Sequence, residues 1–114
     1  MQGDGESAIC DLETGGEVTV KVSLCKQRMD IPTPLILTNG YYLTMAADPS
    51  QDACSLAAAC EMHGFLLQHT QLSDAQCAMP LSLKGNLCIS QIVNPAKGCM
   101  MEFPIGLAGK IFED

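Results

Sequence analysis

The sequence predicts an α+β fold: an antiparallel sheet or open β-barrel of about six to eight short strands, packed on one long, largely buried helix at about residues 49–68. Three observations support this prediction. Segments near the N-terminus alternate apolar and polar residues around short turns, as paired strands do. A capped, strongly apolar segment of helical period follows them. Further short apolar runs, separated by turn residues, complete the chain.

The first strand pair is predicted within residues 7–24, with its turn at Thr14-Gly15-Gly16. Apolar and polar residues alternate strictly along the segment 17–24, which is typical of a half-buried strand. The apolar face of this segment consists of Val18, Val20, Val22 and Leu24.

The second strand pair is predicted at residues 35–45, around the dipeptide Asn39-Gly40. Asn-Gly is the strongest short signal for a two-residue type I′ turn, because both residues tolerate positive φ angles. In that register Leu37 should face Tyr42 across the hairpin.

The helix is predicted to begin after Asp48, a favoured N-cap residue, with Pro49 at the first helical position. An apolar stripe at helical spacing predicts its buried face, which comprises Leu56, Ala59, Cys60, His63, Leu66 and Leu67. Further apolar residues widen that face, namely Cys54, Ala58, Met62 and Phe65. A helix this apolar is expected to be covered on most sides.

The remainder of the chain is predicted to be mostly strand. Ser73 and Gln76 form a capping-box pattern, but Pro80 is expected to limit that helix to one or two turns. Gly85-Asn86 fits a type II′ turn between two strands, and 94–98 reads as a loop. The later strands are expected at 81–84, 87–93, 99–103 and 110–112.

One domain is expected for residues 1–114, with residues 1–6 frayed. The seven cysteines contain no C-x-x-C pair and are odd in number, which argues against both a disulfide framework and a zinc module. Free thiols packed in the core of a cytoplasmic protein are the simpler interpretation. The N-terminus has no signal-peptide pattern, and no apolar run is long enough to cross a membrane.

The net charge of −7 makes this a small acidic protein, and Arg28 is its single arginine. Nucleic-acid and membrane-surface binding both need clustered positive charge, so neither is expected. An acidic surface suits a basic partner protein, and surplus apolar residues favour a homo-oligomer, most simply a dimer.

Cys60 and His63 are the candidates for chemistry, because a thiol and an imidazole three residues apart share one side of a helix. They are weak candidates for a metal site or a nucleophile–base pair, since both fall within the predicted buried stripe, where a thiol is inert. No cofactor is predicted.

Five residues are candidates for ligand or partner binding. Tyr41 and Tyr42 flank the hairpin turn and should point to opposite sides of their strand, so that one is exposed. Arg28 could anchor an interface, and Met62 and Phe65 belong to the apolar surface of the helix.

The function predicted from these features is a non-enzymatic protein-interaction module, homodimeric and acting by binding a partner protein. One alternative is a small-molecule-binding protein with an apolar pocket beside the central helix. A second alternative is a thiol or metal site at Cys60 and His63.

Overall fold

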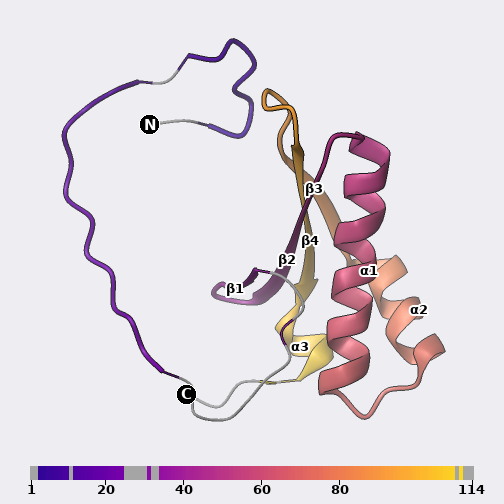
Figure 1. Cartoon of the computed structure of the whole chain (residues 1–114). Coiled ribbons are helices and arrows are strands. Elements are labelled where there is room, and N and C mark those ends of the chain that lie inside the picture. The colour runs from indigo at the N-terminus through magenta and orange to yellow at the C-terminus, as the bar shows by residue number, and fades with distance from the viewer. Residues whose placement is uncertain (1–2, 11, 25–30, 32–33, 110, 112–114) are drawn as a thin grey trace.

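The computed structural model describes residues 3–10, 12–24, 31, 34–109 and 111. Its elements follow one another in the order shown in Figure 1. They are β1 (Leu35–Leu37), β2 (Tyr41–Asp48), α1 (Gln51–His69), α2 (Asp74–Lys84), β3 (Asn86–Gln91), β4 (Lys97–Pro104) and α3 (Ile105–Ala108).

The strands form one antiparallel sheet in the order β1-β2-β4-β3. Helices α1 and α2 lie together on one side of this sheet, as Figure 1 shows. On the other side, no helix or strand of the described residues covers the sheet. The predicted α+β class is confirmed, but the prediction of six to eight strands is wrong for the described residues, which hold a four-stranded open sheet.

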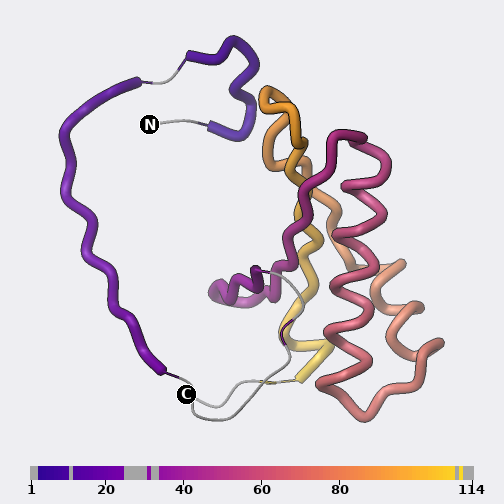
Figure 2. Tube along the Cα trace, viewed as in Figure 1, coloured from indigo at the N-terminus to yellow at the C-terminus, as the bar shows by residue number. Residues whose placement is uncertain are grey.

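The N-terminal hairpin predicted at 7–24 does not form in the described part of that segment. Figure 2 shows residues 12–24 as a long arc that leads away from the sheet and the helices. The valines of the alternating segment are between 73% and 90% exposed, so their common face is uncovered. An extended segment becomes a strand only when another backbone accepts its hydrogen bonds, and no other segment of the described chain does so here.

The hairpin predicted at 35–45 is confirmed by strands β1 and β2, in which Leu37 is the register partner of Tyr42. The Thr38 N–H donates to the Tyr41 carbonyl across the turn (3.0 Å). Gly40 has a φ of +123°, whereas Asn39 has no positive φ. The predicted type I′ turn is therefore wrong, because that turn needs positive φ at both central residues.

Helix α1 begins at Gln51, close to the predicted start, but its N-cap is Ser50 rather than Asp48. The Ser50 hydroxyl accepts the N–H of Ala53 (3.3 Å), and Asp48 Oδ1 accepts the N–H of Ser50 itself (2.7 Å). The aspartate thus shapes the entry to the helix, and the serine caps it.

The sheet buries a different stripe of α1 from the predicted one. The fully buried residues are Cys54, Ala58, Met62, Phe65 and Leu66. Leu56 is 67% exposed and Leu67 is 42% exposed, although both belong to the predicted stripe. The helix is buried along one face only, so the prediction of one long, largely buried helix is not confirmed.

Helix α2 overturns the prediction of a strand at 81–84, because it continues through Pro80 to Lys84. Its start agrees with the predicted capping box, since the Ser73 N–H donates to Gln76 Oε1 (3.0 Å). The helix ends at Lys84, and the N–H of the C-cap residue Gly85 donates to the Leu81 carbonyl (2.8 Å). The predicted turn at Gly85-Asn86 therefore joins a helix to β3, and not two strands.

The core lies between α1 and strands β2 and β4. Phe65 packs edge-on against Tyr42, with ring centroids 5.3 Å apart. Thr44 is buried, and its hydroxyl donates to the Ala58 carbonyl (3.0 Å), which ties β2 to the middle of α1. The Tyr42 hydroxyl donates to the Gly109 carbonyl (3.2 Å) and accepts the N–H of Ile111 (2.9 Å), so it fixes the segment after α3.

The strand predicted at 99–103 is confirmed within β4, which starts earlier, at Lys97, inside the predicted loop. Of the strand predicted at 110–112, residues 110 and 112 lie outside the described residues. Among the helices of the described chain, none combines the length and the apolar character that crossing a membrane requires.

Candidate functional site

The most irregular part of the sheet is a β-bulge in β3. Ile89 pairs with Cys99 and Gln91 pairs with Gly98, so Ser90 is an extra residue that has no partner on β4. Bulges of this kind redirect side chains and are frequent beside active sites. We therefore take the bulge and the turn that follows it as the candidate site.

Gly98 permits the geometry of the bulge. A Cβ atom at position 98 would lie only 2.4 Å from Ser90 Oγ, so the serine side chain occupies the space that any larger residue would fill. A larger residue at position 98 would therefore force the Ser90 side chain out of its present position.

Two polar side chains hold the turn between β3 and β4. Gln91 donates through Nε2 to the Ala96 carbonyl (2.8 Å) and accepts the N–H of Asn94 at Oε1 (3.1 Å). Lys97 Nζ donates to the carbonyls of Ile92 (2.7 Å) and Asn94 (3.0 Å). The turn is thus braced from both strands by side-chain hydrogen bonds.

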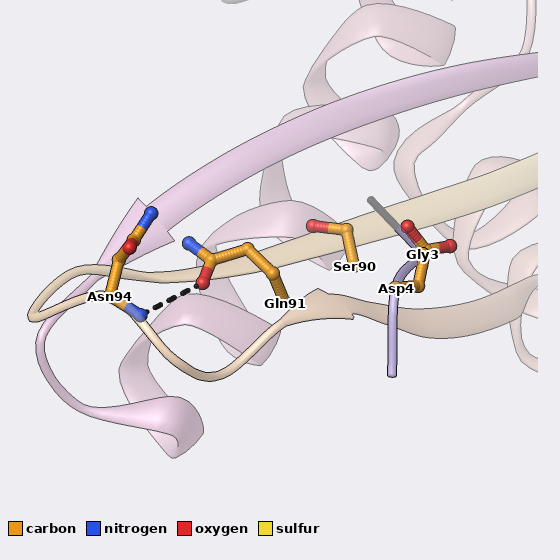
Figure 3. Close-up of a pocket in the computed structure, with 5 residues that line it drawn as sticks. All are labelled: Gly3, Asp4, Ser90, Gln91 and Asn94. Atoms are coloured by element: carbon orange, nitrogen blue, oxygen red, sulfur yellow. Dashed lines mark hydrogen bonds between the residues drawn. The ribbon is translucent and has the colours of Figure 1, made fainter. Parts of the chain in front are cut away.

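Two open cavities meet at the bulge, and both are lined by Ser90 and Gln91. The first, of about 250 Å³, is also lined by Gly3, Asp4 and Asn94 (Figure 3). The second, of about 380 Å³, has a mostly apolar lining, to which β2 and β4 contribute. Its further lining residues are Pro34, Met45, Ala46, Ala47 and Gly98.

Asp4 brings a negative charge to this side of the sheet. Burial raises the pKa of the Cys88 thiol above its ordinary value, and the carboxylates of Glu102 and Asp4 raise it further. Asn86 Nδ2 donates to Glu102 Oε2 (2.9 Å) and to Cys88 Sγ (3.2 Å), which links the three side chains across β3 and β4.

The described side chains that line the two cavities of the candidate site are better suited to forming hydrogen bonds with a ligand than to activating a nucleophile. Ser90 offers a hydroxyl, Gln91 and Asn94 offer amide groups, and Asp4 offers a carboxylate. No imidazole or amine that could activate the serine lines either cavity within the described residues. Likewise, the described chain contains no group of three or more histidine, cysteine or acidic side chains with the geometry of a metal site.

Buried thiols form a second polar cluster, where α1 begins. Cys54 Sγ donates to the carbonyls of Ala46 and Lys97 (both 3.3 Å), and so contacts β2 and β4 at once. Gln51 Nε2 donates to Cys99 Sγ (2.6 Å), and Ser55 Oγ lies 3.5 Å from the same sulfur. These contacts join the first turns of the helix to the sheet, in agreement with a packing role for the two thiols.

The pKa of Cys54 predicts how stability depends on pH. Burial raises this pKa above the ordinary value of 9.0, and the neighbouring Cys99 raises it further. In the folded state, the Cys54 thiol therefore keeps its proton at a pH where the same thiol of the unfolded chain has lost it. We expect full stability below about pH 9, and a decline as the pH rises from there through the folded-state pKa.

The measurement is urea denaturation at a series of pH values between about 8 and about 10.5. Cys54→Ala should show a shallower decline than the unmodified chain. Cys60→Ala, which removes an exposed thiol of the same helix, should keep the original slope. Equal slopes in all three proteins would contradict the assignment to Cys54.

The structure does not bring Cys60 and His63 together as a reactive pair. Cys60 is exposed on α1. His63 Nε2 instead lies 3.3 Å from the Asp74 carbonyl and 3.5 Å from its Oδ1, at the start of α2. His63 therefore contacts the neighbouring helix, and the thiol or imidazole site predicted from spacing gains no support.

Thiol labelling checks this placement. With iodoacetamide on the native protein, we expect Cys10 and Cys60 to be alkylated well before Cys54, Cys77 and Cys99, because the last three are buried. Mass mapping of peptides at successive times gives the order. Early alkylation of Cys54 or Cys99 in the native state would show that this core opens readily.

The predicted binding residues are scattered over the fold. Tyr41 is 44% exposed at the hairpin turn, whereas Tyr42 is buried and anchors the C-terminal segment. Met62 and Phe65 are buried in the core, facing the sheet. Arg28 lies outside the described residues.

The residues of the bulge site were not predicted. The sequence indicated a loop at 94–98, but it carried no signal that Ser90 would be displaced from the ladder. The only hint was Gly98, because a glycine near the start of a strand often marks a bulge or a close backbone approach.

Comparison with known proteins places the fold among enzyme structures. No protein-family model and no curated protein matches the chain. Several solved structures do match it, among them two acetamidase-type proteins. One is an acetamidase from Bacillus halodurans, with 34% identity, a TM-score of 0.64 and coverage of 67% of this chain. The other is a predicted acetamidase/formamidase from Thermoanaerobacter tengcongensis, with 29% identity, a TM-score of 0.65 and coverage of 69%.

The matches cover only part of the two relatives, since this chain spans 26% of the length of each. The covered share of this chain is about as long as the stretch from β1 to α3. The chain therefore resembles about one quarter of an acetamidase-type protein.

The comparisons correct the predicted function. A non-enzymatic protein-interaction module is wrong, because the structures that this chain resembles are acetamidase and formamidase structures. The fold is accordingly enzyme-related. A homo-oligomer and a basic partner protein stay predictions.

Proposed function

We propose that this chain forms part of an amidase that hydrolyses small amides of the acetamide or formamide type. The observation that carries the proposal is the match to the Bacillus halodurans acetamidase, at 34% identity and a TM-score of 0.64 over 67% of the chain. Sequence and fold agree over the same share of the chain, which supports more than a shared architecture.

The geometry supports a binding role for this part of the enzyme. A small amide has a carbonyl that accepts hydrogen bonds and an NH₂ group that donates them. Ser90 carries a hydroxyl that can donate and accept at the meeting point of two cavities. The Gln91 amide already braces the turn, and it keeps one further N–H and one further lone pair. In the described residues these groups lack a base beside the serine, so the groups that attack the amide carbon are expected elsewhere in the amidase.

Two enzyme assays test the proposal. The isolated chain should release no ammonia from acetamide or formamide. In a chimera, the whole chain replaces the matching quarter of the Bacillus halodurans acetamidase, and ammonia release from acetamide should persist. An acetamidase that only lacks the matching quarter serves as the control and should be inactive. A folded chimera as inactive as this deletion control would contradict the proposal.

A further inference from the structure

The face of the sheet that points away from α1 is apolar, although no element of the described residues covers it. Thr44, Ala46 and Cys99 contact α1, so their neighbours along β2 and β4 point to the opposite side. We call this opposite side the open face, and it is formed mainly by Ile36, Leu43, Met45, Cys88 and Met100.

The open face differs from a solvated one. An antiparallel sheet with one face in water normally carries polar residues there. Here Met45 and Met100 are register partners, and Cys88 is the partner of Met100 on β3, which gives an unbroken apolar row across three strands. Leu43 is only 7% exposed, so its position on this face is already covered, whereas its register partner Ile36 is 41% exposed.

Charge is sparse on this face: within the described residues, the carboxylates of Glu102 and Asp4 act on Cys88 there. Of the described residues that β2, β3 and β4 place on the open face, Glu102 is the charged one. Its carboxylate accepts a hydrogen bond from Asn86 (2.9 Å). The apolar cavity of about 380 Å³ also opens here, lined by Met45, Ala47 and Gly98 among others. Depleted charge around an apolar, hollowed centre is typical of the core of a protein interface.

The comparisons indicate what covers the open face. In each of the two matched structures, about three quarters of the polypeptide lie outside the part that resembles this chain. A sheet layer that is apolar on both faces needs a second layer on each of them. We propose that the open face docks against the polypeptide that carries the remaining three quarters of an acetamidase-type fold. The inference rests on the proposed function, because both draw on the same relatives.

Methionine oxidation tests the interface on the unaltered side chains. Hydrogen peroxide converts accessible methionines to sulfoxides, which peptide mass mapping counts one by one. In the chimera, Met45 and Met100 should be oxidised severalfold more slowly than in the isolated chain. Met79, which is 59% exposed on α2 at the other side of the molecule, should react at the same rate in both proteins. Equal reactivity of Met45 in a folded chimera and in the isolated chain would overturn the proposal.

Binding in trans gives a second measurement that does not depend on how the chimera folds. The full 114-residue chain is titrated into the acetamidase that lacks its matching quarter, whose competence is shown by rebinding of its own quarter. Met45→Glu should raise the Kd about tenfold or more, because it places an unpaired charge in the interface. Met79→Glu, the matched control, should leave the Kd unchanged. If the fragment rebinds its own quarter but does not bind this chain, the proposal is wrong.

Other results separate the interface from the amidase function. A chimera that protects both methionines but releases no ammonia would remove the proposed function and keep the interface. An active chimera with unprotected methionines would overturn the interface alone. Protection of Met45 in the isolated chain that increases with concentration would identify a second copy of the chain as the occupant, and would also overturn the proposal.

Discussion

Phe65→Ala is expected to lower the free energy of unfolding by about 3–5 kcal/mol. Phe65 is fully buried at the centre of the core and packs edge-on against Tyr42. Truncation removes the buried ring and leaves a cavity that neither the helix nor the sheet can close by small shifts. Since small domains are stable by only about 5–15 kcal/mol, this one substitution should remove a large share of the total.

Urea denaturation followed by far-ultraviolet circular dichroism measures the effect. Leu67→Ala is the matched control, because Leu67 lies on the same helix two residues later and is 42% exposed. It should cost less than about 1 kcal/mol. If the two variants lost equal stability, α1 would not be anchored to the sheet through Phe65.

Ala58→Glu is expected to prevent folding, or to cost more than about 4 kcal/mol. Ala58 is fully buried where α1 crosses β2, and its carbonyl accepts the Thr44 hydroxyl (3.0 Å). A glutamate there has neither space nor a partner for its charge. The helix would have to move off the sheet to hydrate the carboxylate, which would break the core.

The same substitution one and a half turns earlier should have the opposite sign. Ala53 is exposed in the first turn of α1, three residues after the N-cap Ser50. Ala53→Glu completes a capping box with Ser50 and places negative charge at the positive end of the helix, so a gain of about 0.3–1 kcal/mol is expected. Thermal unfolding of both variants gives the comparison. A folded Ala58→Glu protein with an unchanged midpoint would refute the placement of this helix face.

Short-range signals predicted the local structure well. Asn39-Gly40 located the hairpin of β1 and β2 and its register, although the turn type differs. Ser73 and Gln76 located the start of α2. These features depend on residues at most five positions apart, so a short segment contains most of the interactions that determine them.

The predictions failed where distant contacts compete with local preference. The segment 17–24 has the pattern of a strand, but in the described structure it lies extended and exposed, without a partner. Pro80 was expected to end α2, yet the helix continues for another turn to Lys84. In each case the local rule stated a preference, and the rest of the fold determined the outcome.

The prediction of which face of α1 is buried failed for a different reason. Almost every side of this helix is apolar, so its sequence does not favour one direction strongly. The structure buries the line through Cys54, Ala58 and Met62, and it leaves Leu56 exposed. Only the position of the sheet distinguishes these two faces.

The sequence by itself determined the α+β class, the hairpin of β1 and β2 and the starts of both long helices, because neighbouring residues set turn and cap geometry. Only the tertiary structure decided which side of α1 is buried, that the sheet stays open, and that Ser90 forms a bulge with its hydroxyl beside Gly98. Each of these properties depends on strands that are distant in the chain and adjacent in space. The free energy of such contacts cannot be inferred from any short segment of the sequence.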